Sequence, residues 1–299
     1  RVDIDNDYRE GPKSEVFTQA FKKEFELRML WEITSEFGYN ALIGRTLEKS
    51  GASAVKFDDS ILHRVFHEIK EWIIQNNLDV ISEEQFIPFL NGILHRIRTR
   101  GGVDHLYLSK FRENSLQLWD LNWMRDNRHF LNRMFGLNSR FPRLITTQQH
   151  SRGLLDSTFT NTNNWFRSYF IKSFPLAPNY HGIVNDFYSK LFEVFVYVGL
   201  MNKKGTPEIE NYAIEPSKLV IENRVKTQIC DLCEGKLYVA ASDDIAYGSK
   251  CLDFSCSGSY SLTEASKPNY YQLVYNRNLS QRIYATEHTG ILERGDREK

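Results

Sequence analysis

The sequence lacks any surplus of charge of one sign, any long apolar run and any secretory start. Its 38 Lys and Arg balance 38 Asp and Glu, so no overall basicity indicates a polyanionic partner. The longest apolar run, residues 191–201, is interrupted by Glu193 and is far shorter than the roughly 20 residues that a bilayer requires. No charged and apolar signal stretch opens the chain. We therefore expect a cytoplasmic protein without membrane contact, or an internal piece of a longer one.

Complete catalytic motifs are also missing. Gly235 and Lys236 are followed by Leu237 and lack the upstream glycine of a phosphate-binding loop, and no Asp-Glu-Ala-Asp/His run occurs. His63 and His67 have metal-chelating spacing, but no third ligand can be identified, and a solvated helix face is the favoured interpretation. This stretch alone is not expected to hydrolyse ATP.

What the sequence does contain is a helical first part. With 41% apolar and 13% aromatic residues, the chain can bury real hydrophobic cores. Apolar residues recur at helical spacing in residues 14–37, where the stripe includes Phe25, Leu30 and Ile33. Further helices are predicted from the capping residues at 58–60, and from Ser82, where a capping box with Gln85 is expected.

The later part changes from helical to strand-like patterns. Helices are predicted around residues 165–174 and 183–201, followed by short strands at 209–214 and 219–225 with a turn cluster between them. Two helices followed by a hairpin is the order of a winged helix. We therefore predict a winged-helix-like unit whose hairpin is formed by residues 209–225.

The fold class expected is α+β and multidomain. The predicted divisions are a helical domain (1–100), a basic connector rich in arginine and aromatic residues (101–160), the winged-helix-like unit (161–226), a zinc-binding module (227–266), and the incomplete start of a RecA-like domain (267–299). The charged end at residues 293–299 carries no helix stop signal, so we expect the polypeptide to continue.

Charge is distributed unevenly along the chain. Residues 1–90 hold 11 Lys and Arg against 17 acids, whereas residues 91–152 hold 11 against 4. This basic island contains aromatic residues, a combination that favours phosphate contacts and base stacking. An alternative is that the island packs internally against the acidic first part. The candidate nucleic-acid-binding residues are Arg96, Arg98, Arg100, Arg112, Arg125, Arg128, Arg140 and Arg143, with Trp119 and Trp123 as stacking platforms.

All four cysteines lie close together near the end of the chain. Cys230 and Cys233 form a Cys-x2-Cys pair, and Cys251 and Cys256 form a Cys-x4-Cys pair. Two such turns can present four thiolates to one tetrahedral ion, so the spacing predicts a structural Zn²⁺ in a zinc ribbon. Disulfides, free thiols and an iron–sulfur cluster are the alternatives.

Three segments resemble parts of large bacterial superfamily-two DEAD/DEAH-box helicases, with the Druantia-type phage-defence helicases most similar. Residues 285–298 read A-x-E-H-T-G-x-L-x-R-x-x-R-E, a stretch that in those proteins lies in the second RecA-like domain. Residues 44–51 resemble the G-R-T-L-E-x-x-G element of the insert between their RecA-like domains, and residues 89–107 resemble its arginine-rich helix. The four-cysteine motif has a counterpart in the same insert.

The resemblance implies a parent ATP-dependent helicase that translocates on DNA. ATP and Mg²⁺ would bind mostly outside this stretch, which would guide single-stranded DNA or unwinding duplex, and partners would include other defence-system proteins. Two alternatives remain: a non-enzymatic DNA-binding protein with zinc and winged-helix units, and a protein-interaction scaffold.

Overall fold

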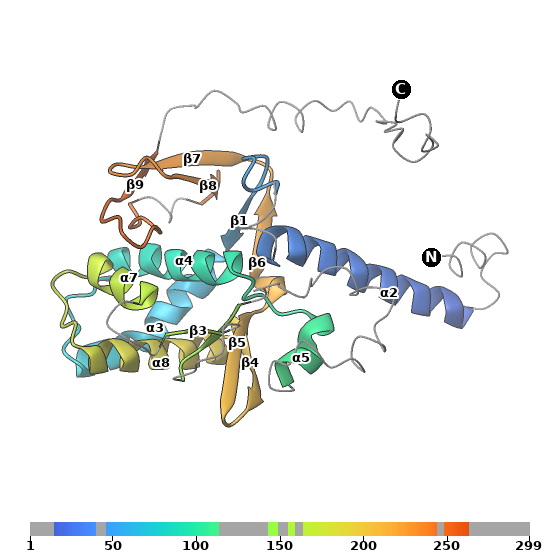
Figure 1. The fold of residues 1–299 in the computed structure, drawn as a ribbon, viewed down its shortest axis with the longest axis horizontal. Coiled ribbons are helices and arrows are strands. Elements are labelled where there is room, and N and C mark those ends of the chain that lie inside the picture. The colour runs from blue at the N-terminus through green and yellow to red at the C-terminus, as the bar shows by residue number, and fades with distance from the viewer. Residues whose placement is uncertain are drawn as a thin grey trace, which may run out of the picture.

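The computed structural model describes residues 15–39, 46–113, 143–148, 155–158, 164–243 and 248–262. These residues form a mixed α/β structure in which a block of helices carries three small sheets (Figure 1). Within these ranges, no helix combines the length and the apolar character of a membrane span.

The first helices agree with the sequence pattern. α2 (Glu15–Thr34) continues into the π-helical turn η1 (Ser35–Tyr39), and α3 (Asp59–Gln75) and α4 (Glu83–Thr99) follow. Asp58 caps α3, because its side chain accepts a hydrogen bond from the backbone N–H of Ser60. Ser82 occupies the N-cap position of α4 but its side chain makes no capping hydrogen bond, so the predicted capping box is wrong.

α2 is correctly placed as a helix, but the side chain that anchors it is not the expected one. The predicted stripe residues Phe25, Leu30 and Ile33 are 55%, 41% and 42% exposed. Trp31, between two of them, is fully buried and packs its ring on those of His105 and Tyr107. The reason is that α2 extends away from the helical block, as Figure 1 shows, whereas Trp31 lies near its C-terminal end.

The basic connector is described at its two ends. η2 (Leu106–Leu108) and α5 (Ser109–Glu113) follow α4, and the strands β2 (Leu144–Thr146) and β3 (Leu155–Ser157) precede the next helices. α7 (Trp165–Ser173) and α8 (His181–Tyr197) occur where the pattern predicts helices.

The predicted hairpin of residues 209–225 is wrong, because its two strands do not pair with each other. β5 (Ile209–Ile214) pairs with β4 (Met201–Thr206), and the sheet order is β3-β2-β5-β4. β6 (Leu219–Glu222), which follows the short η3 (Pro216–Lys218), pairs instead with β1 (Ala54–Phe57). Residues 201–206 carry two lysines and a glycine, so their sequence lacks the apolar alternation that marks a strand.

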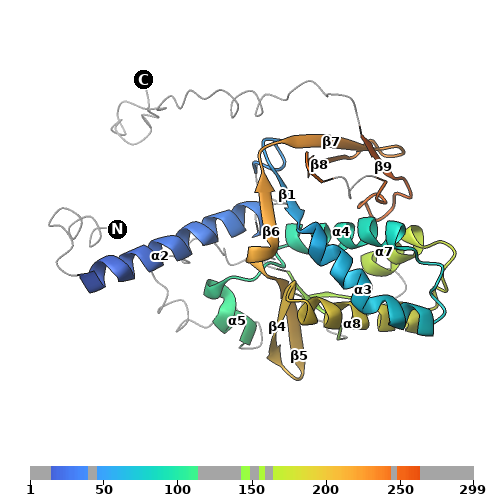
Figure 2. The same cartoon turned by 180° about the vertical axis from the view of Figure 1, so that it is seen from behind.

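The main hydrophobic core joins the two halves of the chain. α3, α4, α7 and α8 pack together, and Figure 2 shows α3 in front of α4 and α8. Phe89 of α4 stacks on Tyr169 of α7 (ring centroids 5.4 Å apart) and also contacts Phe187 of α8 (5.9 Å). Residues of the predicted helical domain and of the predicted winged-helix-like unit thus share one core, and the boundary between those domains stays a prediction.

One glycine permits the close approach of α4 and α7. A Cβ atom at Gly92 would overlap the Tyr169 hydroxyl and lie 2.6 Å from Tyr169 Cζ. We expect Gly92→Ala to destabilise the protein by about 1–3 kcal/mol, because the buried tyrosine must move, although alanine is the better helix former. The matched control is Gly182→Ala in α8, where the added Cβ meets only ordinary contacts with Tyr180. Urea unfolding measures both, and equal stability of the two variants would contradict the expectation.

Candidate metal centre

The cysteines belong to a three-stranded antiparallel sheet. β7 (Val225–Cys230) lies between β8 (Lys236–Ala240) and β9 (Tyr260–Leu262), giving the order β8-β7-β9. The β7–β8 pairing places Ile229 opposite Lys236, so the connecting turn holds Cys233. The β7–β9 pairing places Cys230 opposite Tyr260, which brings the chain carrying Cys251 and Cys256 to the same end of the sheet.

The four sulfur atoms converge as a single ion requires. All lie within 4.8 Å of one another. Cys230 Sγ is 3.5 Å from Cys256 Sγ, and Cys233 Sγ is 3.6 Å from Cys251 Sγ. A tetrahedral zinc ion with Zn–S bonds of about 2.3 Å would have sulfur–sulfur edges of about 3.8 Å. The donor set therefore fits one Zn²⁺, and four thiolates would leave no coordination position open to substrate.

The same sulfur–sulfur distances can be compared with those expected for disulfides and for an iron–sulfur cluster. All four cysteines are free thiols, and their separations are well above the S–S bond length of about 2.05 Å. A cluster of several iron atoms would hold its cysteines at its outer corners, farther apart than ligands of a single ion. The geometry thus favours a single ion, and the metal itself is a matter for elemental analysis.

Each pair of cysteines sits in a hydrogen-bonded turn. In the first, Glu234 donates its backbone N–H to the Cys230 carbonyl oxygen (3.1 Å) and adopts a left-handed φ of 59°, which glycine adopts more readily. In the second, the backbone N–H of Gly258 points at Cys256 Sγ (3.4 Å). Such N–H···S contacts stabilise negative charge on sulfur.

Burial opposes these N–H···S contacts, because it favours the neutral thiol over the thiolate. It raises the pKa of the Cys251 thiol to about 12. Burial also acts to raise the pKa of Cys230, but hydrogen bonds from the backbone amides of Cys233 and Leu232 and from the neighbouring thiols together lower it. A metal would therefore displace protons when it binds, as thiolate coordination requires.

α7 attaches this module to the helical core. The Trp165 indole N–H donates to the Leu252 carbonyl oxygen (2.8 Å). The Lys172 ammonium donates to the carbonyl oxygens of Asp253 (2.8 Å), Cys256 (3.1 Å) and Cys251, all in the second cysteine turn. The sequence does not reveal either contact, because nothing local to residues 165–172 indicates partners 79 to 87 positions away.

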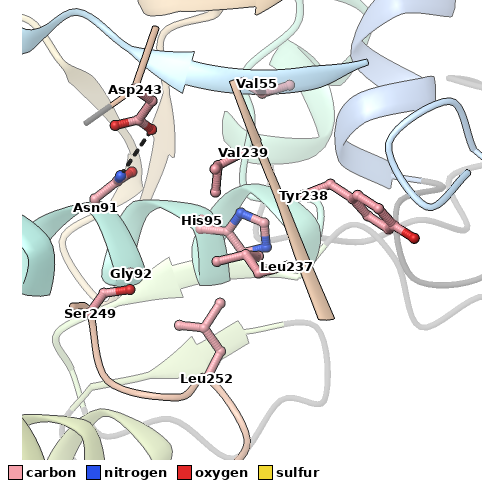
Figure 3. Close-up of a pocket in the computed structure, with 10 residues that line it drawn as sticks. All are labelled: Val55, Asn91, Gly92, His95, Leu237, Tyr238, Val239, Asp243, Ser249 and Leu252. Carbon is pink, nitrogen blue, oxygen red and sulfur yellow. Dashed lines mark hydrogen bonds between the residues drawn. The ribbon is translucent and has the colours of Figure 1, made fainter. Parts of the chain in front are cut away.

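The gap between the module and α4 is narrow. Figure 3 shows His95 and Asn91 of α4 facing Leu252 and Asp243 of the module, with Asn91 Nδ2 hydrogen-bonded to Asp243 Oδ2 (3.3 Å). The enclosed space is about 20 Å³, enough for one water molecule. It is too small for a substrate, so we interpret it as a packing interface.

Two of the candidate DNA-binding arginines do not face outward as expected. Arg98 is fully buried and pairs bidentately with Glu48, with Arg98 Nη1 2.9 Å from Glu48 Oε2. Burial would raise the pKa of Glu48, but the charge and hydrogen bonds of Arg98 keep it below its usual value. Arg98 also donates to the Phe37 carbonyl oxygen and so connects α4 to η1, the turn that follows α2. Its interior position corrects the prediction that it contacts phosphate.

Arg112 is the second buried arginine. Its side chain is fully buried, pairs with Asp104 and donates from Nε to Asn211 Oδ1 (2.8 Å) and from Nη2 to the Asn202 carbonyl oxygen (3.0 Å). These contacts join α5 to the β4–β5 hairpin. The predicted phosphate contact is therefore corrected for Arg112 as well, because no guanidinium surface remains accessible.

Three other candidates lie together. Arg100 is in ion-pair contact with Asp156 (Nε–Oδ2 2.8 Å), and its carbonyl oxygen accepts from the backbone N–H of Arg143 (2.9 Å). Arg96 lies over the Trp165 ring, 4.9 Å from its centroid. Burial, together with the charges of Arg100 and Arg143, lowers the pKa of Arg96 to about 10, and Asp156 acts in the opposite direction. We call Arg96, Arg100 and Arg143 the arginine cluster.

The remaining candidates cannot be placed. Arg125, Arg128, Arg140, Trp119 and Trp123 lie outside the described residues, as does the segment 285–298.

Comparisons with protein-family models, with curated proteins and with solved structures find no match to this chain.

Gly258 provides a test of the metal centre. A Cβ at this position would lie 2.6 Å from Cys230 Sγ and overlap the Asp231 carboxylate. We expect Gly258→Ala to displace the sulfur and to weaken zinc binding by at least about tenfold, as measured by competition with a chromophoric chelator. The control is Ser257→Ala, which changes the exposed neighbouring residue. Unchanged zinc affinity in Gly258→Ala would contradict the proposed ligand geometry.

Proposed function

We propose that this chain is a zinc-stabilised nucleic-acid-binding region of a larger DEAD/DEAH-box helicase. The observation that carries the nucleic-acid part is Arg96 in the arginine cluster, where the charges of Arg100, Arg143 and Asp156 all act on its guanidinium group. Nε of Arg96 has no hydrogen-bond partner among the described residues. A half-buried guanidinium group with an unpaired N–H is suited to a phosphate group.

Zinc acts structurally in this proposal. Cys230, Cys233, Cys251 and Cys256 hold the ion, which keeps the second cysteine turn in shape. That turn accepts the hydrogen bond from Trp165, and Trp165 in turn lies beneath Arg96. The metal centre thus supports the arginine cluster through one aromatic side chain, and no catalytic role is assigned to it.

The winged-helix interpretation is retained in a changed form. The unit consists of α7, α8 and the hairpin β4–β5, with β2 pairing on β5. We propose no DNA contact for α8, because its exposed charged residues are Asp186 and Glu193, with only Lys190 half-buried beside them. The negative charges of Asp186 and Glu193 would repel phosphate from this face. In this proposal the unit therefore supports α4 and the arginine cluster and does not itself bind DNA.

The helicase part rests on the resemblance of residues 44–51, 89–107 and 285–298. One contact is consistent with it: Glu48, from the first element, pairs with Arg98, from the second. ATP and Mg²⁺ bind elsewhere in the parent protein, which acts in the cytoplasm, where reduced cysteines remain available to zinc. We propose antiphage defence as its setting and other defence proteins as its partners.

The proposal fixes the metal content of the chain. Elemental analysis of the purified chain should give about one zinc per chain, because four thiolates form one closed site. Less than half an equivalent, or iron in place of zinc, would contradict it.

The proposal also predicts the effect of arginine substitutions on DNA binding. Arg96→Ala combined with Arg143→Ala should weaken binding to a labelled single-stranded oligonucleotide on the order of tenfold, whatever its sequence. The slope of log affinity against log salt should fall by about 0.7 to 0.9 for each phosphate that the variant no longer binds. Fluorescence anisotropy at several salt concentrations measures both quantities. Arg98 is not substituted, because its removal would leave the buried Glu48 carboxylate without its ion-pair partner.

The matched control removes two positive charges elsewhere. Arg64→Ala with Lys70→Ala changes two exposed residues of α3 and alters the net charge equally. An equal loss of affinity in this control would show a general charge effect. Unchanged affinity and salt slope in the cluster variant, with its fold retained, would refute the nucleic-acid role of the cluster.

A further inference from the structure

The metal-binding end of the sheet exposes two large apolar side chains. Leu232, in the first cysteine turn, is 66% exposed, and Phe254, in the second, is 49% exposed. Both turns surround the same four sulfur atoms, and a Cβ at Gly258 in the second turn would lie 3.1 Å from Leu232 Cβ. Leu232 and Phe254 thus lie on the two turns of one cysteine cluster, and exposed apolar side chains at such a place are candidates for an interaction site.

These turns are held by their own hydrogen bonds. Asp231 Oδ1 accepts from the backbone N–H of Ser259 (2.8 Å), and Asp253 Oδ1 accepts from that of Ser255 (2.9 Å). A partner would therefore meet a preformed surface and would lose little free energy in ordering it.

The charge around the two apolar residues is negative. Asp231, Glu234 and Asp253 are exposed, and four thiolates around one divalent cation add a formal charge of about −2. Lys172 donates to carbonyl oxygens of the second turn, and Lys250 donates to Ser259 Oγ (3.0 Å), so among the described residues of the module Lys236, at the start of β8, is the exposed lysine. Phosphate groups would be repelled here, whereas cationic groups would be attracted.

We propose that Leu232 and Phe254, with Asp231, Glu234 and Asp253 around them, form a docking surface for a basic amphipathic segment of another protein. Charge complementarity selects this partner: its apolar side chains cover Leu232 and Phe254, and its lysine or arginine side chains meet the surrounding carboxylates. We call these five residues the knuckle surface. It is separate from the arginine cluster and can be tested independently of nucleic-acid binding.

The test uses the full zinc-loaded chain and a labelled synthetic amphipathic helix of leucine and lysine. Fluorescence anisotropy should show saturable binding that weakens at about 0.5 M salt, because part of the attraction is electrostatic. Leu232→Ser with Phe254→Ser should lower the affinity at least about tenfold. Leu106→Ser, which alters an exposed leucine of η2 beside α5, should leave it unchanged. Zinc content measured for every variant excludes those that have lost the metal centre.

Three results would overturn the proposal. One is equal affinity of the unaltered chain and the zinc-loaded knuckle variant for the peptide. Another is equal binding of a leucine–glutamate helix, which would remove the charge argument. The third is a loss of single-stranded DNA binding in the knuckle variant with peptide binding unchanged, which would assign this surface to nucleic acid.

Discussion

The attachment of the cysteine module to α7 is the contact on which the arrangement of the candidate sites depends. α7 is short, but its two faces act differently: Phe166 and Phe170 are buried in the helical core, whereas Trp165 and Lys172 bind the second cysteine turn. A sheet of three short strands buries little apolar surface, so the module depends on these hydrogen bonds for its position. Weakening that contact would also disturb Arg96, which lies on Trp165.

The arginines of the basic island fall into a buried, ion-paired group and a second group, the arginine cluster. Arg98 and Arg112 are interior residues whose charges are neutralised by Glu48 and Asp104, and each joins elements distant in the sequence. Arg96, Arg100 and Arg143 lie together near Asp156. Part of the island therefore packs internally, as the alternative suggested, and the proposed anion contacts are confined to the remaining arginines.

The proposed surfaces differ in their electrostatics. The arginine cluster is suited to phosphate, whereas the knuckle surface combines exposed apolar side chains with carboxylates. In a helicase such a division would allow one region to hold DNA while its zinc module contacts another protein. Because Trp165 connects Arg96 to the second cysteine turn, events at the two surfaces could influence each other through a single side chain.

The local pattern of residues determined the helices and the metal site. Apolar spacing located α3 and α4, and the spacing of Cys230, Cys233, Cys251 and Cys256 indicated four ligands for one ion, because both signals depend on residues near one another in the chain. Only the tertiary structure decided which strands pair, which arginines are buried and which side chains hold the zinc module. β4 pairs with β5, although its lysines interrupt the apolar alternation that would predict a strand. Arg98 can be buried because its charge is paired with that of Glu48, which lies 50 residues earlier in the chain. Such outcomes depend on contacts between distant segments, and no local pattern of residues encodes them.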